Sequence, residues 1–215
     1  MTLITIGGWS RRLVGTAALA TLLLSTTAFG AAAFQQSPML DAGVADGSLP
    51  PVEQRLPPEP LVITPVSEVG SYGGTARAMR SSTEEFGDAT SVVGIESLTR
   101  LNAEDGATIE PNLAQSWEWS NDDKTLTMTL RKGLKWSDGE PFTTADIAFW
   151  WDDVINNTEL TPTMPGDWMS GGEPMKLTVV DAETFKLDFK EPNRLLELLI
   201  ARDGYQGQIF LPAHF

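Results

Sequence analysis

The clearest absence in this 215-residue sequence is cysteine. Without thiols the chain forms no disulfide, binds no metal through thiolates and has no thiol nucleophile. A bacterial lipoprotein anchor also requires a cysteine after the leader, so none is expected. Histidine is almost absent too, since His214 is the only one. A Ser-His-Asp triad or a metal site of several histidines is therefore not expected within this chain.

Positive charge is scarce as well. Lysine and arginine number 15 against 29 aspartates and glutamates, which gives a formal net charge of −14 at pH 7. Such a chain is repelled by nucleic acid phosphates and by anionic membrane surfaces. We expect neither as a partner. Most of the acidic side chains should lie on a solvated surface, and their excess is compatible with a cationic or neutral ligand.

The first 33 residues have the pattern of a cleaved secretory signal. Arg11 and Arg12 precede an uncharged, mostly apolar run over 13–29, and small residues at 31–33 suit a signal peptidase. The apolar run is shorter than the roughly 20 residues that span a bilayer, which favours cleavage over an uncleaved membrane anchor. The sequence therefore predicts export, by the general or the twin-arginine route.

Composition divides the rest of the chain into two parts. Residues 34–60 contain six prolines and few large apolar side chains, so we expect a linker there. Residues 61–215 are expected to form the folded domain. It should begin with strands over 61–63 and 76–79 and a helix over 90–98.

The strongest local pattern lies in residues 112–155. Trp117 and Trp119 stand two residues apart and therefore share one face of a predicted strand. Apolar and polar side chains then alternate over 125–131, which predicts a second strand, and the polar residues 121–124 suit the turn between the two. This stretch therefore predicts a β-hairpin.

A helix should follow a second turn at residues 137–140. Thr143 and Asp146 have the spacing of a capping box, with aspartate in place of the usual glutamate or glutamine. The apolar residues that share one helical face are Ile147, Trp150, Trp151, Val154 and Ile155. We interpret these aromatic side chains as core.

Residues 158–202 predict a loop, a second hairpin and a final helix. The loop over 158–175 is rich in threonine, proline, glycine and methionine, and its Trp168 either packs on the body or offers a ligand a stacking surface. Strands are expected over 175–180 and 184–190. The helix after Pro192 is apolar on more than one side, so we expect it to be well buried.

The stretch from 112 to 155 also resembles the signature of the family 5 extracellular solute-binding proteins, which serve ABC importers of peptides, nickel complexes and some oligosaccharides. The matching phrases are SWE at 116–118, LRKGLKW at 130–136, DGEPF at 138–142 and TADI at 144–147, and a separate segment, IFLPAHF at 209–215, also resembles the family. More than forty residues align without a gap. The motif marks the fold and holds no ligand chemistry, and it makes His214 a landmark of the fold.

The resemblance implies a mixed α/β fold. The chain should form the N-terminal lobe of a two-lobed periplasmic binding protein, incomplete because family members run to more than twice this length. It also implies the substrate-binding component of an ABC importer, a monomer that captures a solute in the periplasm and delivers it to a membrane permease. The solute is a peptide by default, with an oligosaccharide as the alternative, and no cofactor, metal or catalysis is implied.

Five residues are candidates for ligand contact. In the family, the loop after the 76–79 strand approaches the ligand cleft, which points to the hydroxyl, carboxylates and ring of Ser82, Glu84, Glu85 and Phe86. A solvated loop is the alternative interpretation. Trp168 completes the set. Charged groups that hold a peptide's termini in family members come largely from the part of the fold beyond this chain.

Two rival hypotheses stay open. A secreted hydrolase that uses carboxylates would need a facing pair, but the neighbouring acids Glu84/Glu85, Asp122/Asp123 and Asp152/Asp153 diverge on a strand or helix. The other rival is a non-functional truncated fragment with no saturable ligand response, which exposes apolar surface that absent strands cover in the family.

Overall fold

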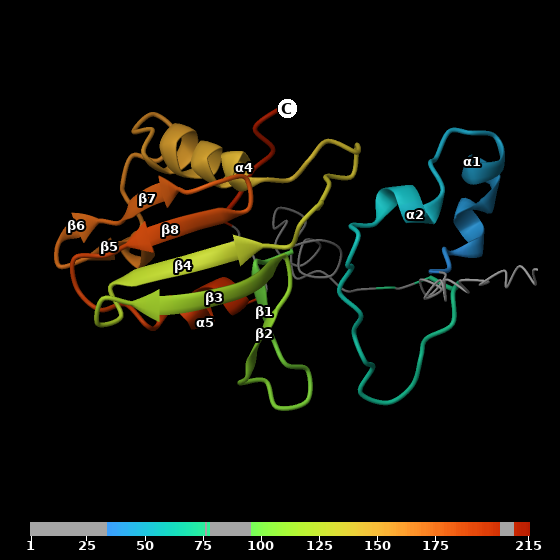
Figure 1. Cartoon of the computed structure of the whole chain (residues 1–215), viewed down its shortest axis with the longest axis horizontal. Helices are drawn as coiled ribbons and strands as arrows, with labels where there is room; N and C mark the ends of the chain where they lie inside the picture. Colours follow the sequence, from blue (N-terminus) through green and yellow to red (C-terminus); the bar gives the residue numbers. More distant parts are fainter. Residues whose placement is uncertain (1–33, 76, 78–95, 203–208) are drawn as a thin grey trace, which may run out of the picture. The chain divides into compact units, whose positions relative to one another are not determined.

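A computed structural model describes residues 34–75, 77, 96–202 and 209–215 (Figure 1). The predicted signal over 1–33 lies outside the described residues. So do the 76–79 strand, apart from residue 77, and the first six residues of the 90–98 helix. The last three residues of that predicted helix are described and are not helical.

The central element is a four-stranded antiparallel sheet in the order β3-β4-β8-β7. Its strands are β3 (Ala114–Ser120), β4 (Thr125–Leu130), β7 (Lys176–Val179) and β8 (Thr184–Asp188). Both predicted hairpins are confirmed, since β3 pairs with β4 and β7 with β8. The pairing of β4 with β8 joins the two hairpins into one sheet and was not predicted.

The register of the sheet aligns apolar side chains into rows across the strands. One row runs through Trp119, Leu126, Leu187 and Leu177, and the next through Trp117, Met128, Phe185 and Val179. On the two inner strands these side chains are buried, whereas the tryptophans of β3 are half-buried and Val179 on β7 is exposed. Because cross-strand neighbours share a face, the rows give the sheet one continuous apolar side.

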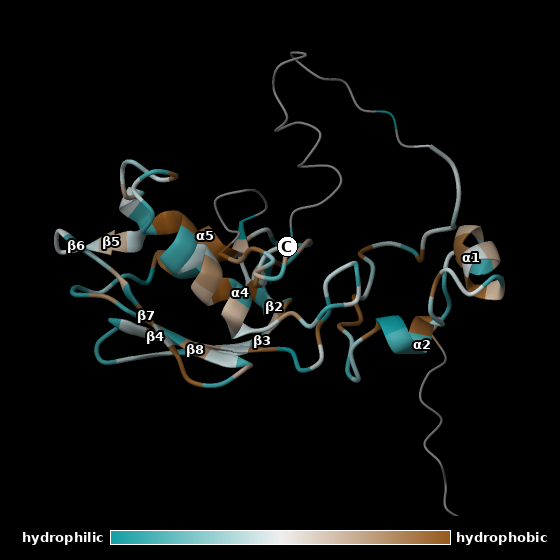
Figure 2. Ribbon diagram, turned by 90° about the horizontal axis from the view of Figure 1, so that it is seen from above, coloured by the Kyte–Doolittle hydropathy of each residue, from teal (hydrophilic) through white to brown (hydrophobic). Residues whose placement is uncertain are grey.

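Helices cover that apolar side (Figure 2). The predicted capping box is confirmed at the start of α4 (Thr144–Phe149). Ala145 N–H donates to Thr143 Oγ1 (3.2 Å), and Thr143 N–H donates to Asp146 Oδ2 (2.8 Å). The helix then widens into a π-helix, η2 (Trp150–Ile155). Trp150 and Trp151 are buried, as predicted for the core.

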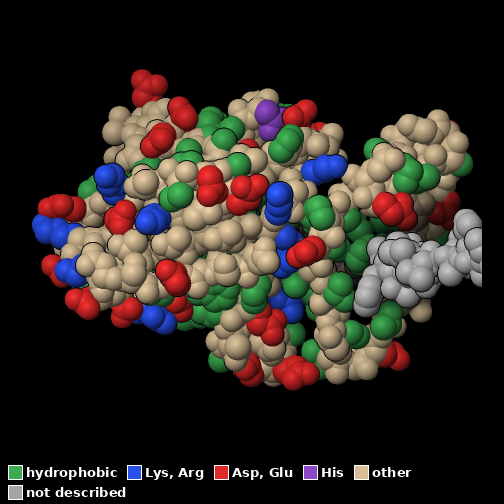
Figure 3. Space-filling model, viewed as in Figure 1, with side chains coloured by type: hydrophobic (Ala, Val, Ile, Leu, Met, Phe, Trp, Pro, Cys, Tyr) green, Lys and Arg blue, Asp and Glu red, His purple; other side chains and the backbone are tan. Residues whose placement is uncertain are grey.

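The C-terminal segment is tied to the start of α4. Ala213 N–H donates to Asp146 Oδ1 (3.0 Å), and Leu211 N–H donates to the Asp146 carbonyl (3.2 Å). Nearby, Phe210 packs edge-on against Phe142 with ring centroids 5.0 Å apart. His214 lies on the surface beside acidic side chains (Figure 3), where its Nε2 is 2.8 Å from Asp138 Oδ2. These contacts tie the C-terminal segment to α4 and to the 137–140 turn.

Residues 61–63 do not form the predicted strand. They have no regular structure, and Val62 and Ile63 are exposed, because no strand among the described residues pairs with them. The short sheet of this region is instead β1 (Thr99–Leu101) with β2 (Ile109–Pro111).

Three short helices lie in the segment that the sequence assigns to a linker. They are η1 (Pro38–Leu40), α1 (Asp41–Ala45) and α2 (Val52–Arg55). The division into a signal, a linker and a domain at residues 33 and 60 stays a prediction. No helix in the described part of the chain is both long and apolar enough to cross a membrane.

Candidate functional site

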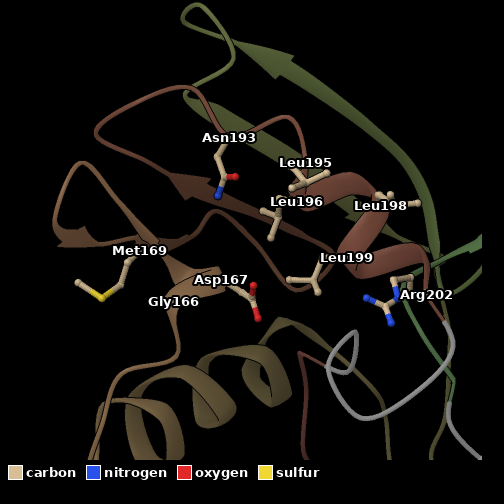
Figure 4. Close-up of a pocket in the computed structure, with 9 residues that line it drawn as sticks. All are labelled: Gly166, Asp167, Met169, Asn193, Leu195, Leu196, Leu198, Leu199 and Arg202. Carbon is tan, nitrogen blue, oxygen red and sulfur yellow. The ribbon is translucent and has the colours of Figure 1, made fainter.

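The candidate site is a hollow beside the last helix, α5 (Leu196–Ala201), with a volume of about 350 Å³ (Figure 4). Its lining comes from two segments that are distant in sequence. The lining residues are Gly166, Asp167, Met169, Asn193, Leu195, Leu196, Leu198, Leu199 and Arg202. The hollow therefore combines an aliphatic surface with one carboxylate, one amide and one guanidinium group.

The leucines of this hollow correct the expectation that α5 is buried on several sides. Leu196 and Ile200 face the core, but Leu195 is 73% exposed and Leu198 is 40% exposed. The expectation was wrong because, among the described residues, α5 packs against β1 and β2 and into the core on one side only. Its other apolar face therefore lines the hollow.

The opposite wall is the segment that contains Trp168. A single 3-10 turn, η3 (Gly166–Trp168), leads into β5 (Met169–Ser170), which pairs with β6 (Glu173–Pro174). Trp168 is only 4% exposed and packs edge-on against Trp150, with ring centroids 5.0 Å apart. Because the buried indole anchors the turn, the preceding Asp167 is exposed at the hollow.

Hydrogen bonds hold this wall to the rest of the domain. Met175 N–H donates to the Trp168 carbonyl (2.8 Å). Ser170 Oγ donates to the Glu191 carbonyl (2.8 Å) and accepts from Glu191 N–H (2.9 Å). Lys190 forms an ion pair with Glu173 on β6. The wall is thus connected to the chain that leads from β8 into α5, which fixes both sides of the hollow relative to each other.

Three polar side chains line the hollow. Asp167, Asn193 and Arg202 make no side-chain hydrogen bond or ion pair with any residue that the structure describes. Figure 4 shows Asp167 and Arg202 at different edges of the hollow, with Leu199 between them. A carboxylate accepts hydrogen bonds, a guanidinium group donates several, and an amide does both. The arrangement can recognise a ligand that carries polar groups and an apolar surface.

A second hollow, of about 210 Å³, also borders this turn. Its lining is mostly apolar and comes from η2, the 160–168 loop and the C-terminal segment. The lining residues are Trp150, Val154, Ile155, Leu160, Thr161, Pro165, Asp167, Trp168, Phe210 and Leu211. Asp167 is therefore shared by the two hollows.

Of the predicted ligand residues, only Trp168 lies among the described residues. Ser82, Glu84, Glu85 and Phe86 lie outside them, so their role stays a prediction. The indole of Trp168 packs in the core and borders the second hollow, and its ligand role stays a prediction too. Sequence reasoning missed Asp167, Asn193 and Arg202, since a single charge beside a tryptophan or after a leucine run has no distinctive pattern.

The neighbouring acids Asp122 and Asp123 have different surroundings in the structure. Asp123 forms an ion pair with Arg194, at 3.3 Å, and its neighbour Asp122 is exposed. No group of three or more histidine, aspartate or glutamate side chains among the described residues gathers into a metal site. The hydrogen bond from His214 is the main cause that lowers the pKa of Asp138, and this pair links the 137–140 turn to the C-terminal segment.

Comparison with known sequences identifies a family. The model of the family described as "Bacterial extracellular solute-binding proteins, family 5 Middle" matches residues 108–209. The chain is 36% identical over 167 residues to a periplasmic alpha-galactoside-binding protein of Rhizobium meliloti. That alignment covers 69% of this chain and 24% of the relative.

Comparison with solved structures agrees with this family match. An oligopeptide-binding protein OppA aligns at 37% identity with a TM-score of 0.74, covering 85% of this chain and 28% of that protein. The periplasmic binding protein MelB of Agrobacterium fabrum, solved in complex with stachyose, aligns at 32% identity with a TM-score of 0.58 over 79% of this chain and 28% of its own. The chain thus spans about a quarter of the length of these relatives.

Proposed function

The chain belongs to the family 5 extracellular solute-binding proteins, and from this premise we propose that it serves as part of the substrate-binding component of an ABC importer. The observation that carries the proposal is the agreement of fold and sequence with OppA over 85% of the chain at a TM-score of 0.74. The fold is that of the periplasmic binding proteins.

In the proposed mechanism the exported, monomeric protein captures a solute in the periplasm and presents it to a membrane permease. Capture in two-lobed binding proteins depends on hinge closure around the ligand. The chain contributes one wall of such a site, and the hollow beside α5 supplies polar groups and apolar surface to it. No chemical change of the solute is part of the mechanism.

A peptide is the solute of first choice. The support is the similarity to an oligopeptide-binding protein and, at 27% identity over 122 residues, to the dipeptide-binding protein DppE of Bacillus subtilis. An oligosaccharide is the second candidate, and a specific observation favours it. The two relatives with sugars in their descriptions, from Rhizobium meliloti and Agrobacterium fabrum, align over 69% and 79% of this chain.

Calorimetric titration separates the two ligand classes. The full chain is titrated with leucyl-leucine, a tripeptide mixture, raffinose and stachyose, and each mixture is then examined by mass spectrometry. We expect saturable heat from one class and intact ligand afterwards. Release of monosaccharides or amino acids would favour the hydrolase hypothesis over solute capture. A folded chain without saturable heat for any ligand would favour the non-functional fragment.

A further inference from the structure

Residues 34–60, which the sequence assigns to a linker, have an internal structure of their own. Arg55 holds it together, because its Nε donates to the Pro50 carbonyl (2.9 Å) and its Nη2 donates to Gln36 Oε1 (2.6 Å). The amide of Gln36 in turn donates from Nε2 to Asp41 Oδ1 (2.7 Å). These bonds connect the two ends of the segment, which we call the strap.

The strap is attached to the turn that follows β4. Residues 131–135 of this turn have the sequence RKGLK, and we call them the basic turn. Lys135 Nζ donates to the Gln54 carbonyl (2.7 Å), and Arg131 Nη1 donates to the Glu59 carbonyl (3.1 Å). Both acceptors are main-chain carbonyls, so the basic turn recognises the backbone of the strap through charge-assisted hydrogen bonds.

A close approach of the two backbones accompanies these bonds. Gly133 has φ +75°, and a Cβ added there would lie 2.8 Å from Pro58 Cδ. The position therefore requires glycine both for its conformation and for contact with the strap. Gly139 also has a positive φ, +98°, but a Cβ added there would meet no atom within 4 Å. The two glycines separate the effect of backbone strain from the effect of the strap.

The attachment of the strap is weak enough to be reversible. No residue of the strap is buried, and a hollow of about 570 Å³ remains between residues 49–55 and 135–139. The bond between Arg131 and Glu59 joins residues 72 positions apart, and closing so long a loop costs conformational entropy. Segments with few buried apolar contacts open locally while the core stays folded. We therefore expect the strap to leave the basic turn without unfolding of the sheet.

The strap and the basic turn both contain sites for proteases that cut after lysine or arginine. Arg131 and Lys132 are adjacent, and such sites in exposed turns are preferred positions of cleavage. A protease of trypsin specificity must take the basic side chain into its own pocket. In the attached state Arg131 is instead held by the carbonyls of Glu59 (3.1 Å) and Asn112 (3.4 Å), and Arg55 is bonded within the strap.

We propose that the strap is a reversible cover of the basic turn, and that the attached strap protects both segments from proteases that cut after basic residues. Release of the strap exposes the peptide bonds after Arg55 and Arg131 together. When opening and closing are fast, cleavage follows the population of the open form. This protective role goes beyond solute capture and does not depend on the identity of the solute.

The first test removes one attachment from the side of the basic turn. The full chain is digested briefly with trypsin, and mass spectrometry follows cleavage after Arg55. Lys135→Met should speed this cleavage about two- to fivefold, the value of an exposed charge-assisted contact. Lys132→Met, an exposed lysine of the same turn, is the matched control and should leave the rate unchanged. Because neither substitution is near Arg55 in sequence, an effect there must pass through the attachment.

The second test uses the two glycines. Gly133→Ala should speed cleavage after Arg55 about fivefold or more, because the added methyl group displaces the strap. Gly139→Ala strains the backbone in a similar way but should leave the rate unchanged. Pro58→Ala removes the ring carbons that the methyl group would meet, so Gly133→Ala should add little in that background. If Gly133→Ala fails to fold, Lys135→Met still carries the test.

The third test reverses the direction. Arg55→Met removes the bonds that organise the strap and should speed cleavage after Arg131, whereas Glu53→Gln, an exposed neighbour, should not. Gln54→Ala keeps the main-chain carbonyl that Lys135 binds, so it should not change cleavage after Arg131 either.

Cleavage after Lys186, on the inner strand β8, reports unfolding of the sheet and should stay constant in all variants. Equal rates after Arg55 in Lys135→Met and Lys132→Met would overturn the proposal. So would cleavage after Lys186 that rises in proportion, since the variants would then unfold the domain. Cleavage of the unmutated chain after Arg55 as fast as in urea would show that the strap is not attached. None of these results bears on solute capture, which the calorimetric titration tests separately.

Discussion

The stretch from β3 to η2 and the helix α5 are both rich in apolar side chains, yet the sequence predicts the burial of the first far better than that of the second. In the first, only four residues separate the paired strands β3 and β4, and the helix start carries its own capping box. In the second, α5 packs against β1 and β2, about ninety residues earlier. Local partners make a pattern predictive, whereas distant partners decide which face of a helix is covered.

The largest loss of stability is expected from a substitution in the central sheet. Phe185 on β8 is completely buried and lies opposite Met128 and Val179. Phe185→Ala should lower the free energy of unfolding by about 3–5 kcal/mol, through lost burial and the cavity left behind. Urea denaturation followed by tryptophan fluorescence measures the loss. The control Val179→Ala, at the exposed edge of the same row, should cost about 1 kcal/mol or less; equal losses would contradict the difference in burial between the two positions.

The buried and the exposed face of α5 give a second test of the same difference. Leu196 is 2% exposed and Leu198 is 40% exposed, although both are leucines of one short helix. Leu196→Ala should lower the free energy of unfolding by about 3 kcal/mol, and Leu198→Ala by about 1 kcal/mol or less. The same urea titration compares them. A large loss for Leu198→Ala would show that a partner buries this face of α5 in solution.

One residue of the capping box, Asp146, makes both a local and a long-range hydrogen bond. Asp146 is buried and accepts hydrogen bonds from the N–H groups of Thr143 and Ala213. Asp146→Ala leaves both donors without this partner, so we expect a loss of about 2 kcal/mol. Asp153→Ala, an exposed acid in the same helical stretch, is the control and should cost much less. Proteolysis of the C-terminal segment should also speed up in Asp146→Ala alone.

The smallest effect is expected from the pair of Asp138 and His214. The pKa of Asp138 lies below its ordinary 3.8, mainly because of the hydrogen bond with His214 and, second, because the carboxylate accepts a hydrogen bond from the Glu140 N–H. A carboxyl group whose pKa is lower in the folded state stabilises the fold above its unfolded pKa, and this contribution disappears as the pH falls through the folded value. Asp138→Asn should therefore lower the unfolding midpoint slightly at pH 7, with the difference closing below about pH 4. A difference independent of pH would refute this linkage.

The turn between β3 and β4 shows how far local reasoning extends. Asn121, Asp122 and Asp123 all have positive φ, between 53° and 61°. Asparagine and aspartate are the residues other than glycine that most readily adopt this conformation, so the polar run predicts the turn. The π-helix after Phe149 shows the limit of this reasoning. The apolar residues of this segment fit one face of an ordinary helix with 3.6 residues per turn, so their spacing does not indicate the wider turn of a π-helix.

The candidate site was predictable only at Trp168. That residue drew attention as an aromatic side chain in a glycine- and proline-rich loop, and the structure places it at the border of the second hollow, packed on Trp150. Asp167, Asn193 and Arg202 carry no such signal. They line one hollow because β5–β6 and the chain after β8 are tied together.

The sequence by itself determined the two hairpins, the capped helix and the family, because alternation, turn residues and the capping box act over a few neighbouring residues. Only the tertiary structure decided that β4 pairs with β8, that Leu195 before α5 and Leu198 within it are exposed, and that Asp167 lines two hollows. Each of these depends on contacts between segments far apart in the chain. Such contacts follow from the packing of whole layers, and no short run of residues encodes them.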